Sequence, residues 1–525
     1  MVKIIRGGGY KLKKIWFMLA SVVVLNLYLN FNHITRIFSD KILGVQVLSA
    51  EEIDSLCEGK EDAYLEPFLT LDGGRIAYDA EQNMLLIPQK MSGEDFHGVL
   101  RPSEGRLYFA QDAAFADKSA AMRSNQVFRL FWVTDSRCWM YNVYFTGMPV
   151  VEIKTGREDE AGNCMGDIWI SDPYHSTLEY QHAAGSWRRR GATTLNYEKA
   201  SYRLTLDGDK LSLLGMRRDD DWILHSLYDD DGLIHNKLSY EVWREIASDN
   251  SVQGDEGIRM EYVELFVDNR YQGVYGLSER IDRKTLGLNE KDILYKCKDQ
   301  TGPGEDDFYE ELTEDMNPVF EMKYPKQTSR SAWEPLRLWT SLFLENKPGI
   351  YEDGKQILDL ENAVDYNLFN LLISGMDNIM KNIYFWADYQ EDGSYQFIKI
   401  PWDLNMTWGN SWTDDASCNF SRYQEKNIHS PDGWSEDMYV LYEQDKEEIG
   451  RLLNERWVEL REEIVTKEAI YEKADADFAY LYDSGAAIRN EQRWPREVDY
   501  WKDEYLYQYI DGRIDFLDDY FGRMR

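Results

Sequence analysis

The sequence has few of the residues that build common metal and redox centres. Its 525 residues include five cysteines and seven histidines, and no two cysteines form a Cys-x-x-Cys pair. This scarcity disfavours zinc sites and thioredoxin-like chemistry. The five cysteines are Cys57, Cys138, Cys164, Cys297 and Cys418. Two interpretations of them stay open. They form one or two disulfides and leave at least one thiol unpaired, or most of them are small buried apolar side chains.

Several widespread functional motifs are also absent. The chain has no Gly-x-x-x-x-Gly-Lys-Ser/Thr loop, no Gly-x-Gly-x-x-Gly turn, no Gly-x-Ser-x-Gly elbow and no His-Glu-x-x-His pair. Simple P-loop, dinucleotide-fold, α/β-hydrolase and zinc-protease interpretations therefore lose support. The chain also lacks a basic stripe, and its 59 Lys and Arg against 94 Asp and Glu give a net charge of −35. So acidic a surface repels phosphate backbones, and we expect no nucleic-acid partner.

The chain does contain enough apolar residues for several cores. Hydrophobic residues make up 43% and aromatic residues 14% of the sequence, which argues against global disorder. A length of 525 residues exceeds one typical domain and predicts two or three packed units.

The first fifty residues differ from the rest in charge. Residues 1–50 carry seven Lys and Arg against one Asp, and an apolar run extends from Ile15 to Leu29. As a helix this run is about 22 Å long, and the lysines before it keep the N-terminus cytoplasmic. The pattern predicts an uncleaved membrane anchor that places the acidic remainder outside the cytoplasm. The alternative is a signal peptide cleaved near Ala50, which makes the protein secreted.

Two strand-rich regions follow this segment. Residues 51–165 contain short alternating runs bounded by turn residues, which predict a β domain. Residues 166–298 contain further strands, including an antiparallel hairpin of 261–267 with 271–277. Between strands, residues 234–247 have apolar positions at helical spacing.

The remainder, residues 299–525, is predominantly helical. Helices are predicted at 333–345, at 360–374 behind Asp359 as the cap, and almost continuously from 438 to 521. The whole pattern predicts an α+β fold, in which an N-terminal β domain precedes a strand-rich lobe (166–298) and a helix-rich lobe (299–525).

One segment of the helix-rich lobe combines features needed for phosphoryl transfer. A helix ends before Asp377, Asn382 follows five residues later, and a hairpin then leads to Asp403 in Pro-Trp-Asp-Leu-Asn. In this reaction one Asp accepts the hydroxyl proton, an Asn binds a metal, and a second Asp bridges metal and phosphates. Asp-x-x-x-x-Asn is a short pattern, and a chain with 94 acidic residues also produces it by chance. The hypothesis therefore depends on the position of the pattern, after a helix and before a hairpin that ends in Pro-Trp-Asp.

A second segment suits phosphate binding. Arg190-Gly191 is followed by two threonines, and Lys199 precedes a predicted strand. Backbone amides beside a glycine can approach phosphates, and a strand lysine can reach their oxygens. A basic turn with a solvated lysine at a strand edge explains the same residues equally well.

With these motifs the chain resembles the spore coat protein H (CotH) kinase family of atypical kinases, over about Asp167 to Arg525. The shared features are Asp377 with Asn382, the Pro-Trp-Asp-x-Asn/Asp-x-Thr-x-Gly motif at residues 401–409, and several upstream segments. The upstream segments are Arg190 to Thr194, Lys199 to Leu204, Asn236 and Gly273 to Glu279. The preceding β domain is similar to the leader domain of exported bacterial members.

The resemblance implies a two-lobe, kinase-like fold that uses ATP and Mg²⁺ or Mn²⁺. It implies that Lys199 binds the nucleotide phosphates, that Arg190-Gly191 covers them, and that Glu279 marks the adenine hinge. It implies that Asp377 is the catalytic base or orients the hydroxyl group, and that Asn382 and Asp403 bind the metal. The motif departs from many members at Asn405, which stands in place of a second Asp and has no charge to offer a hard cation. Trp402 and Trp408 flank the motif, and we expect them to fix the loop by aromatic packing.

Three functions fit these residues. The leading hypothesis is an ATP-dependent, metal-requiring kinase that phosphorylates Ser/Thr of surface or coat proteins. The second is a membrane-anchored surface pseudokinase that acts as a scaffold or adhesin, because ATP is scarce outside the membrane and fungal relatives act as adhesins. The third is a carbohydrate-active enzyme that uses Asp377 and Asp403 as paired acids.

Overall fold

The computed structural model describes most of the chain between residues 41 and 522. The apolar run from Ile15 to Leu29 and the thiol of Cys418 lie outside the described residues. In the described part, no helix is both long and apolar enough to cross a membrane. The described ranges are 41–62, 69–111, 117–160, 162–174, 180–191, 193–208, 210–230, 232–298, 319–327, 329–343, 350–379, 381–410, 435–495 and 503–522.

The N-terminal unit is an eight-stranded sheet with the order β1-β2-β9-β10-β11-β7-β6, and β3 pairs with β11. Alternate side chains of its central strands, such as Leu130 and Tyr141, are fully buried. The strands are β1 (Lys41–Ile42), β2 (Val45–Leu48), β3 (Glu61–Asp62), β6 (Ala77–Asp79), β7 (Met84–Pro88), β9 (Arg106–Ala110), β10 (Phe128–Val133) and β11 (Arg137–Thr146). The smaller sheet β5-β4-β8 belongs to the same stretch of chain, with β4 (Leu69–Leu71), β5 (Gly74–Arg75) and β8 (Leu100–Pro102).

A disulfide links helix α2 to the N-terminal sheet. It joins Cys57 at the end of α2 (Ala50–Cys57) to Cys138 in β11, 81 residues later. Among the described cysteines, Cys164 carries a free thiol. The described residues therefore contain one of the one or two disulfides that the composition allowed.

Removing this disulfide is expected to destabilise the N-terminal sheet by about 2–4 kcal/mol, because a closed loop of this length restricts the unfolded chain. The measurement is urea unfolding of a Cys57→Ser/Cys138→Ser variant, followed by tryptophan fluorescence. Cys164→Ser removes a free, partly exposed thiol and serves as the matched control. Equal midpoints for the two variants would contradict a stabilising role for the bond.

The second unit is a closed barrel of seven strands in the order β12-β13-β14-β15-β18-β20-β19. It closes where β12 pairs in parallel with β19, and the predicted hairpin of β19 with β20 is confirmed. Because β12 belongs to the barrel, the N-terminal sheet ends at Thr146. The barrel strands are β12 (Val150–Glu158), β13 (Cys164–Ser171), β14 (Tyr180–Arg190), β15 (Ser201–Leu206), β18 (Asp221–His225), β19 (Met260–Val267) and β20 (Arg270–Ser278).

The third unit is a four-stranded sheet, β22-β21-β23-β24, surrounded by helices. Asp359 caps α8 by accepting a hydrogen bond from the backbone N–H of Asn362, as predicted. Its strands are β21 (Ile293–Cys297), β22 (Phe320–Tyr324), β23 (Ile383–Tyr389) and β24 (Tyr395–Pro401). The helices from α4 to the end of the described chain are α4 (His235–Ser248), α5 (Arg283–Leu286), α6 (Arg330–Phe343), α7 (Ile350–Ile357), α8 (Leu360–Ile373), α9 (Glu436–Gln444), α10 (Lys446–Leu460), α11 (Lys467–Asp483), α12 (Ala486–Arg493) and α13 (Asp503–Gly522).

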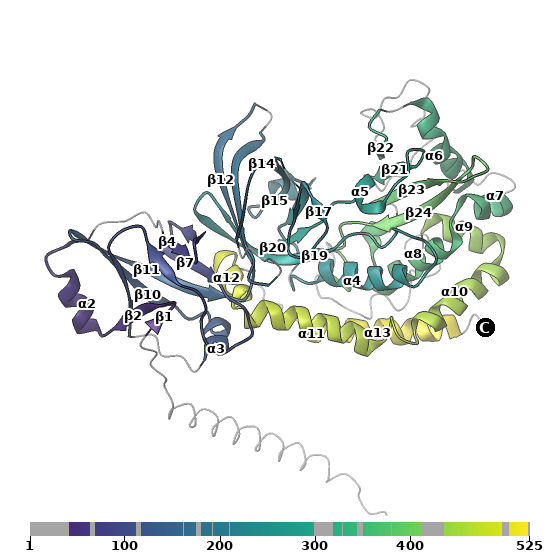
Figure 1. Ribbon diagram of the computed structural model, residues 1–525. Coiled ribbons are helices and arrows are strands. Elements are labelled where there is room, and N and C mark those ends of the chain that lie inside the picture. Colours follow the sequence, from purple (N-terminus) through teal and green to yellow (C-terminus); the bar gives the residue numbers. More distant parts are fainter. Residues whose placement is uncertain are drawn as a thin grey trace, which may run out of the picture.

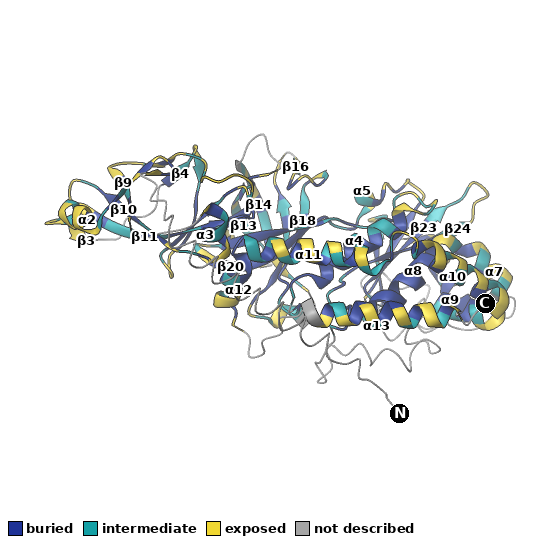
Figure 2. Cartoon of the chain, turned by 90° about the horizontal axis from the view of Figure 1, so that it is seen from below, coloured by how far each residue is buried: buried dark blue, intermediate teal, exposed yellow. Residues whose placement is uncertain are grey.

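The three units follow one another along the molecule (Figure 1). The N-terminal sheet lies at one end, the barrel in the middle and the four-stranded sheet with its helices at the other end. The long helices α11 and α13 run along one side, and their exposed and buried residues alternate as expected for amphipathic surface helices (Figure 2). The α+β class is therefore observed.

Helix α12 lies where the N-terminal sheet meets the barrel. Its Arg489 donates two hydrogen bonds, of 2.8 and 2.7 Å, to the carboxylate of Glu264 in β19. The same guanidinium donates to Asn125, which follows α3 (Lys118–Arg123) of the N-terminal unit, at 2.7 Å. Glu264 also accepts a hydrogen bond from the hydroxyl of Tyr271. One buried arginine thus connects all three parts of this junction.

Candidate active site at the end of strand β24

The Pro-Trp-Asp loop follows β24 and has an unusual backbone. Asp403 and Trp408 have φ values of +61° and +53°, a left-handed region that bulky residues rarely adopt. Helix α4 holds the loop in place, because Asn236 accepts a hydrogen bond from the backbone N–H of Leu404 at 2.9 Å. The backbone N–H of Asp403 donates to the hydroxyl of Tyr240 on the same helix at 3.1 Å. Left-handed residues held by surrounding contacts are typical of functional loops.

Asn378 joins this loop to the segment before the hairpin. Its side-chain amide donates to the carbonyl of Asn382 at 3.2 Å and to the carbonyl of Trp402 at 2.8 Å. Asn382 also has a left-handed backbone, with φ of +56°. Asn378 is fully buried in the short helix η4 (Met376–Asn378). No sequence motif singles out Asn378, although it stands directly after Asp377.

The acidic side of the site combines two distant segments. Asp229, between β18 and α4, interacts electrostatically with Asp403 and accepts a side-chain hydrogen bond from Asn405. Burial and the neighbouring Asp403 charge raise the pKa of Asp229 to about 6. The next residue, Asp230, is hydrogen-bonded to the ring of His235 at 2.7 Å. No sequence motif identifies Asp229, since an acidic run gives no sign of which carboxylate enters a site.

Two cationic side chains lie next to the ring of Trp402 in this site. The guanidinium of Arg190, at the end of β14, lies 5.4 Å from the ring centroid, and the ammonium of Lys296, in β21, lies 5.9 Å from it. Burial lowers the pKa of Lys296 to about 8, and the Asp403 carboxylate opposes this shift. Trp402 itself is only 2% exposed. The expected packing role of this tryptophan is therefore observed, with two cations beside its ring.

Gly191 forms the sharp turn after Arg190. Its φ is +124°, and a Cβ atom there would lie 1.8 Å from the hydroxyl oxygen of Thr194. Only glycine fits this turn, which directs the chain away from the end of β14.

Lys199 and Glu279 lie deeper in the protein. The ammonium of Lys199 donates to the carbonyl of Val274 at 2.6 Å and to the side chain of Asn490 in α12 at 2.9 Å. Lys199 is only 1% exposed. The carboxylate of Glu279 accepts hydrogen bonds from the backbone N–H groups of Arg217 and Arg259, at 3.2 and 2.9 Å. Both side chains therefore bind parts of the barrel.

Asp377 lies in η4, next to Asn378 in the chain. Its carboxylate pairs with Lys381 at 3.3 Å and is partly accessible. The structure thus places Asp377, Asn382 and Asp403 on segments that Asn378 connects.

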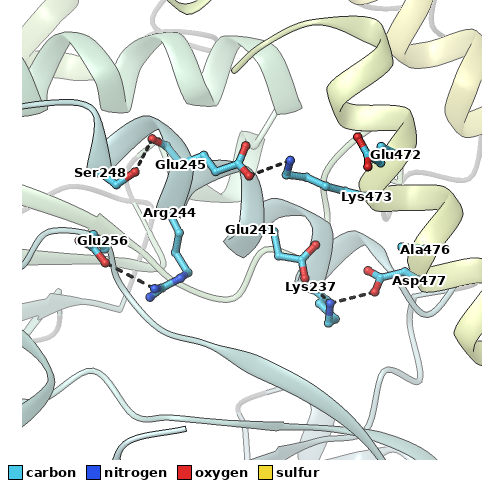
Figure 3. A pocket seen from close by; sticks show the side chains of 10 residues that line it. All are labelled: Lys237, Glu241, Arg244, Glu245, Ser248, Glu256, Glu472, Lys473, Ala476 and Asp477. Carbon is cyan, nitrogen blue, oxygen red and sulfur yellow. Dashed lines mark hydrogen bonds and ion pairs between the residues drawn. The ribbon is translucent and has the colours of Figure 1, made fainter. Parts of the chain in front are cut away.

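A separate hollow of about 720 Å³ lies between α4 and α11 (Figure 3). Its charged side chains largely pair with one another, as in Lys473 with Glu245 and Arg244 with Glu256. Lys237 pairs with Glu241 and with Asp477 across the hollow. The Lys473–Glu245 and Lys237–Asp477 pairs join α11 to α4, and none of the lining residues belongs to the Pro-Trp-Asp loop.

The oxygen-rich side of the site suits a hard divalent cation. The carboxylate of Asp403 makes no hydrogen bond or ion pair to the residues that the structure describes, and Asp229 and Asn405 supply further oxygens next to it. Mg²⁺ and Mn²⁺ prefer such ligands. Across the described ranges, no group of three or more His, Cys, Asp or Glu side chains is close enough to hold a metal by itself. One or two carboxylates with substrate phosphates is the usual arrangement for Mg²⁺.

Comparison with known proteins identifies the family of the chain. A family model described as CotH kinase protein matches residues 187–517, which is more than half of the chain. The chain belongs to the CotH kinase family. Inner spore coat protein H of Bacillus subtilis (strain 168) is 23% identical to it over 251 residues, which cover 46% of this chain and 64% of that protein. The match spans less than two thirds of the relative's length.

The CotH match begins in β14 and ends in α13. It therefore includes Arg190, the acidic pair of Asp229 and Asp403, and all other site residues described above. The N-terminal sheet precedes the CotH region.

Proposed function

We propose that this protein is a metal-dependent kinase that transfers the γ-phosphate of ATP to Ser or Thr hydroxyls of a surface or coat protein. The observation that carries the proposal is the combination of the Asp403 and Asp229 carboxylates with the Arg190 guanidinium, which lies on the neighbouring Trp402 ring and has no ion pair among the described residues. Phosphoryl transfer needs carboxylates for the metal and cations for the phosphates in one place. The family membership and the coat-protein relative support the proposal.

In this proposal the barrel is the small lobe and the four-stranded sheet with its helices is the large lobe. The Arg190-Gly191 turn covers the phosphates from the barrel, and Glu279 lies near the connection that serves as the adenine hinge. Lys199 supports the barrel behind the phosphate site. Asp403, Asn405 and Asn382 hold Mg²⁺ or Mn²⁺, which supplies charge neutralisation at the transferring phosphoryl group.

Asp377 is the residue that handles the substrate hydroxyl. Its carboxylate is partly accessible and pairs with Lys381, so it can orient a Ser or Thr hydroxyl and accept its proton. Catalysis then comes from positioning and electrostatic stabilisation, with no covalent enzyme intermediate. The N-terminal segment anchors the protein in the membrane or directs its secretion, so that the kinase meets its protein substrate outside the cytoplasm.

The test uses the full-length protein with ATP labelled at the γ-phosphate, Mn²⁺ or Mg²⁺, and a generic Ser/Thr protein. We expect label on protein and a rise in melting temperature when nucleotide and metal are added, because a ligand specific for the folded state stabilises it. Stabilisation without label would favour a nucleotide-binding pseudokinase. Neither label nor stabilisation would favour a surface scaffold or adhesin and would contradict the proposal.

A further inference from the structure

The ammonium group of Lys296 in the candidate site has no hydrogen bond or ion pair to the described residues. Strand register places it beside Tyr384 of β23, and its ammonium lies 5.8 Å from the Tyr384 ring centroid and 5.9 Å from the Trp402 centroid. Within the described residues, the side chains of Lys296 and Arg190 make no hydrogen bond or ion pair. A partly buried cation without such a partner lowers stability, so its presence calls for a ligand.

The other cations near this site already have partners. Lys323 in β22 pairs with Glu321, and Arg203 and Arg280 both pair with Asp221. Lys199, two residues before β15 of the barrel, donates hydrogen bonds to Val274 and Asn490. To reach a phosphate, Lys199 would have to break both hydrogen bonds in a buried environment, which is costly.

We propose that Lys296, together with Arg190, binds the phosphate chain of the nucleotide in this site. This inference rests on the proposed function. The Lys296 ammonium interacts electrostatically with the Arg190 guanidinium and with the Asp403 carboxylate, and this carboxylate has no ion pair among the described side chains. A phosphate chain with a divalent cation complements both sides, because its oxygens accept from the ammonium and guanidinium while its cation binds the carboxylates.

The test compares Lys296→Met with Lys291→Met. Lys291 is exposed, lies just before β21 and rests 4.2 Å from the ring centroid of Tyr389, so it is a matched lysine on an aromatic ring. Binding of the non-hydrolysable analogue AMP-PNP with Mn²⁺, and of adenosine alone, is measured by titration calorimetry. We expect Lys296→Met to weaken AMP-PNP binding about 10- to 100-fold, as for loss of a charged hydrogen bond. Lys291→Met should change it less than twofold.

Two further measurements separate binding from folding. Lys296→Met should leave the melting temperature of the ligand-free protein unchanged or higher, whereas Lys199→Met should lower it. Lys296→Arg keeps the charge and should recover part of the AMP-PNP affinity.

The outcomes distinguish this inference from the proposed function. Wild-type protein that fails to bind AMP-PNP with Mn²⁺ would contradict the proposed function itself. Wild-type binding that Lys296→Met leaves unchanged would overturn only the role of Lys296. An equal loss of adenosine and AMP-PNP affinity would also overturn it, because Lys296 would then support the nucleoside rather than the phosphates.

Discussion

Replacing Asp403 by asparagine is expected to lower the rate of phosphoryl transfer by about 10³-fold, the scale of losing one main electrostatic contact to the transition state. The backbone around Asp403 is held by hydrogen bonds to Asn236 and Tyr240, so the substitution should not move the loop. The Asp403 carboxylate has no ion pair among the described residues that the substitution would break. Asparagine keeps the size and one oxygen but removes the charge that a divalent cation prefers. The measurement is γ-phosphate transfer at saturating ATP and Mn²⁺.

The same variant should be at least as stable as the wild type without ligands. Asp403 raises the pKa of Asp229, which means that the two carboxylates repel each other, and asparagine removes this repulsion. Asp388→Asn, which changes a carboxylate of β23 that bonds Gln390, is the control for an Asp-to-Asn change in the hairpin that precedes Asp403. Wild-type turnover in Asp403→Asn would remove the basis of the proposed function.

The largest expected effect on stability is at the helix α12 junction. Arg489→Met should lower the free energy of unfolding by about 3–5 kcal/mol, because it leaves the Glu264 carboxylate buried without its cation. The Arg489 and Glu264 side chains are 2% and 0% exposed. Thermal unfolding followed by circular dichroism at neutral pH measures the change.

An exposed ion pair between the same two units provides the control. Arg270 of the barrel pairs with Glu81 of the N-terminal unit, and their side chains are 59% and 66% exposed. Arg270→Met should therefore cost about 0–1 kcal/mol. Adding Glu264→Gln to Arg489→Met should recover part of the loss, since the unpaired charge is removed. Similar melting temperatures for Arg489→Met and Arg270→Met would show that apolar packing, rather than this ion pair, holds the junction.

Local sequence patterns predicted most of the local structure. Alternation and a tight turn predicted the hairpin of β19 with β20, helical spacing predicted α4, and Asp359 marked the start of α8. These elements depend on neighbours within a few residues, which a sequence shows directly. The parallel pairing of β12 with β19 that closes the barrel joins segments about a hundred residues apart. No local sequence pattern indicates this pairing.

The same distinction applies to the site. Asp377, Asn382 and Asp403 stood out because they surround one hairpin. Asp229 and Lys296 did not, because each reaches the site from a separate segment through tertiary packing. The environment of Lys199 was equally hidden, since its partner Asn490 lies 291 residues further along the chain.

Helix α12 also bears on how the chain can be divided. Gly273 of β20 has no room for a Cβ atom, which would lie 2.4 Å from the Asn490 side chain, so the helix rests directly on the barrel wall. A fragment that stopped before α12 would expose this wall and remove Asn490 from Lys199 and Arg489 from Glu264. The contacts that complete the barrel can therefore form only after nearly the whole polypeptide has been synthesised.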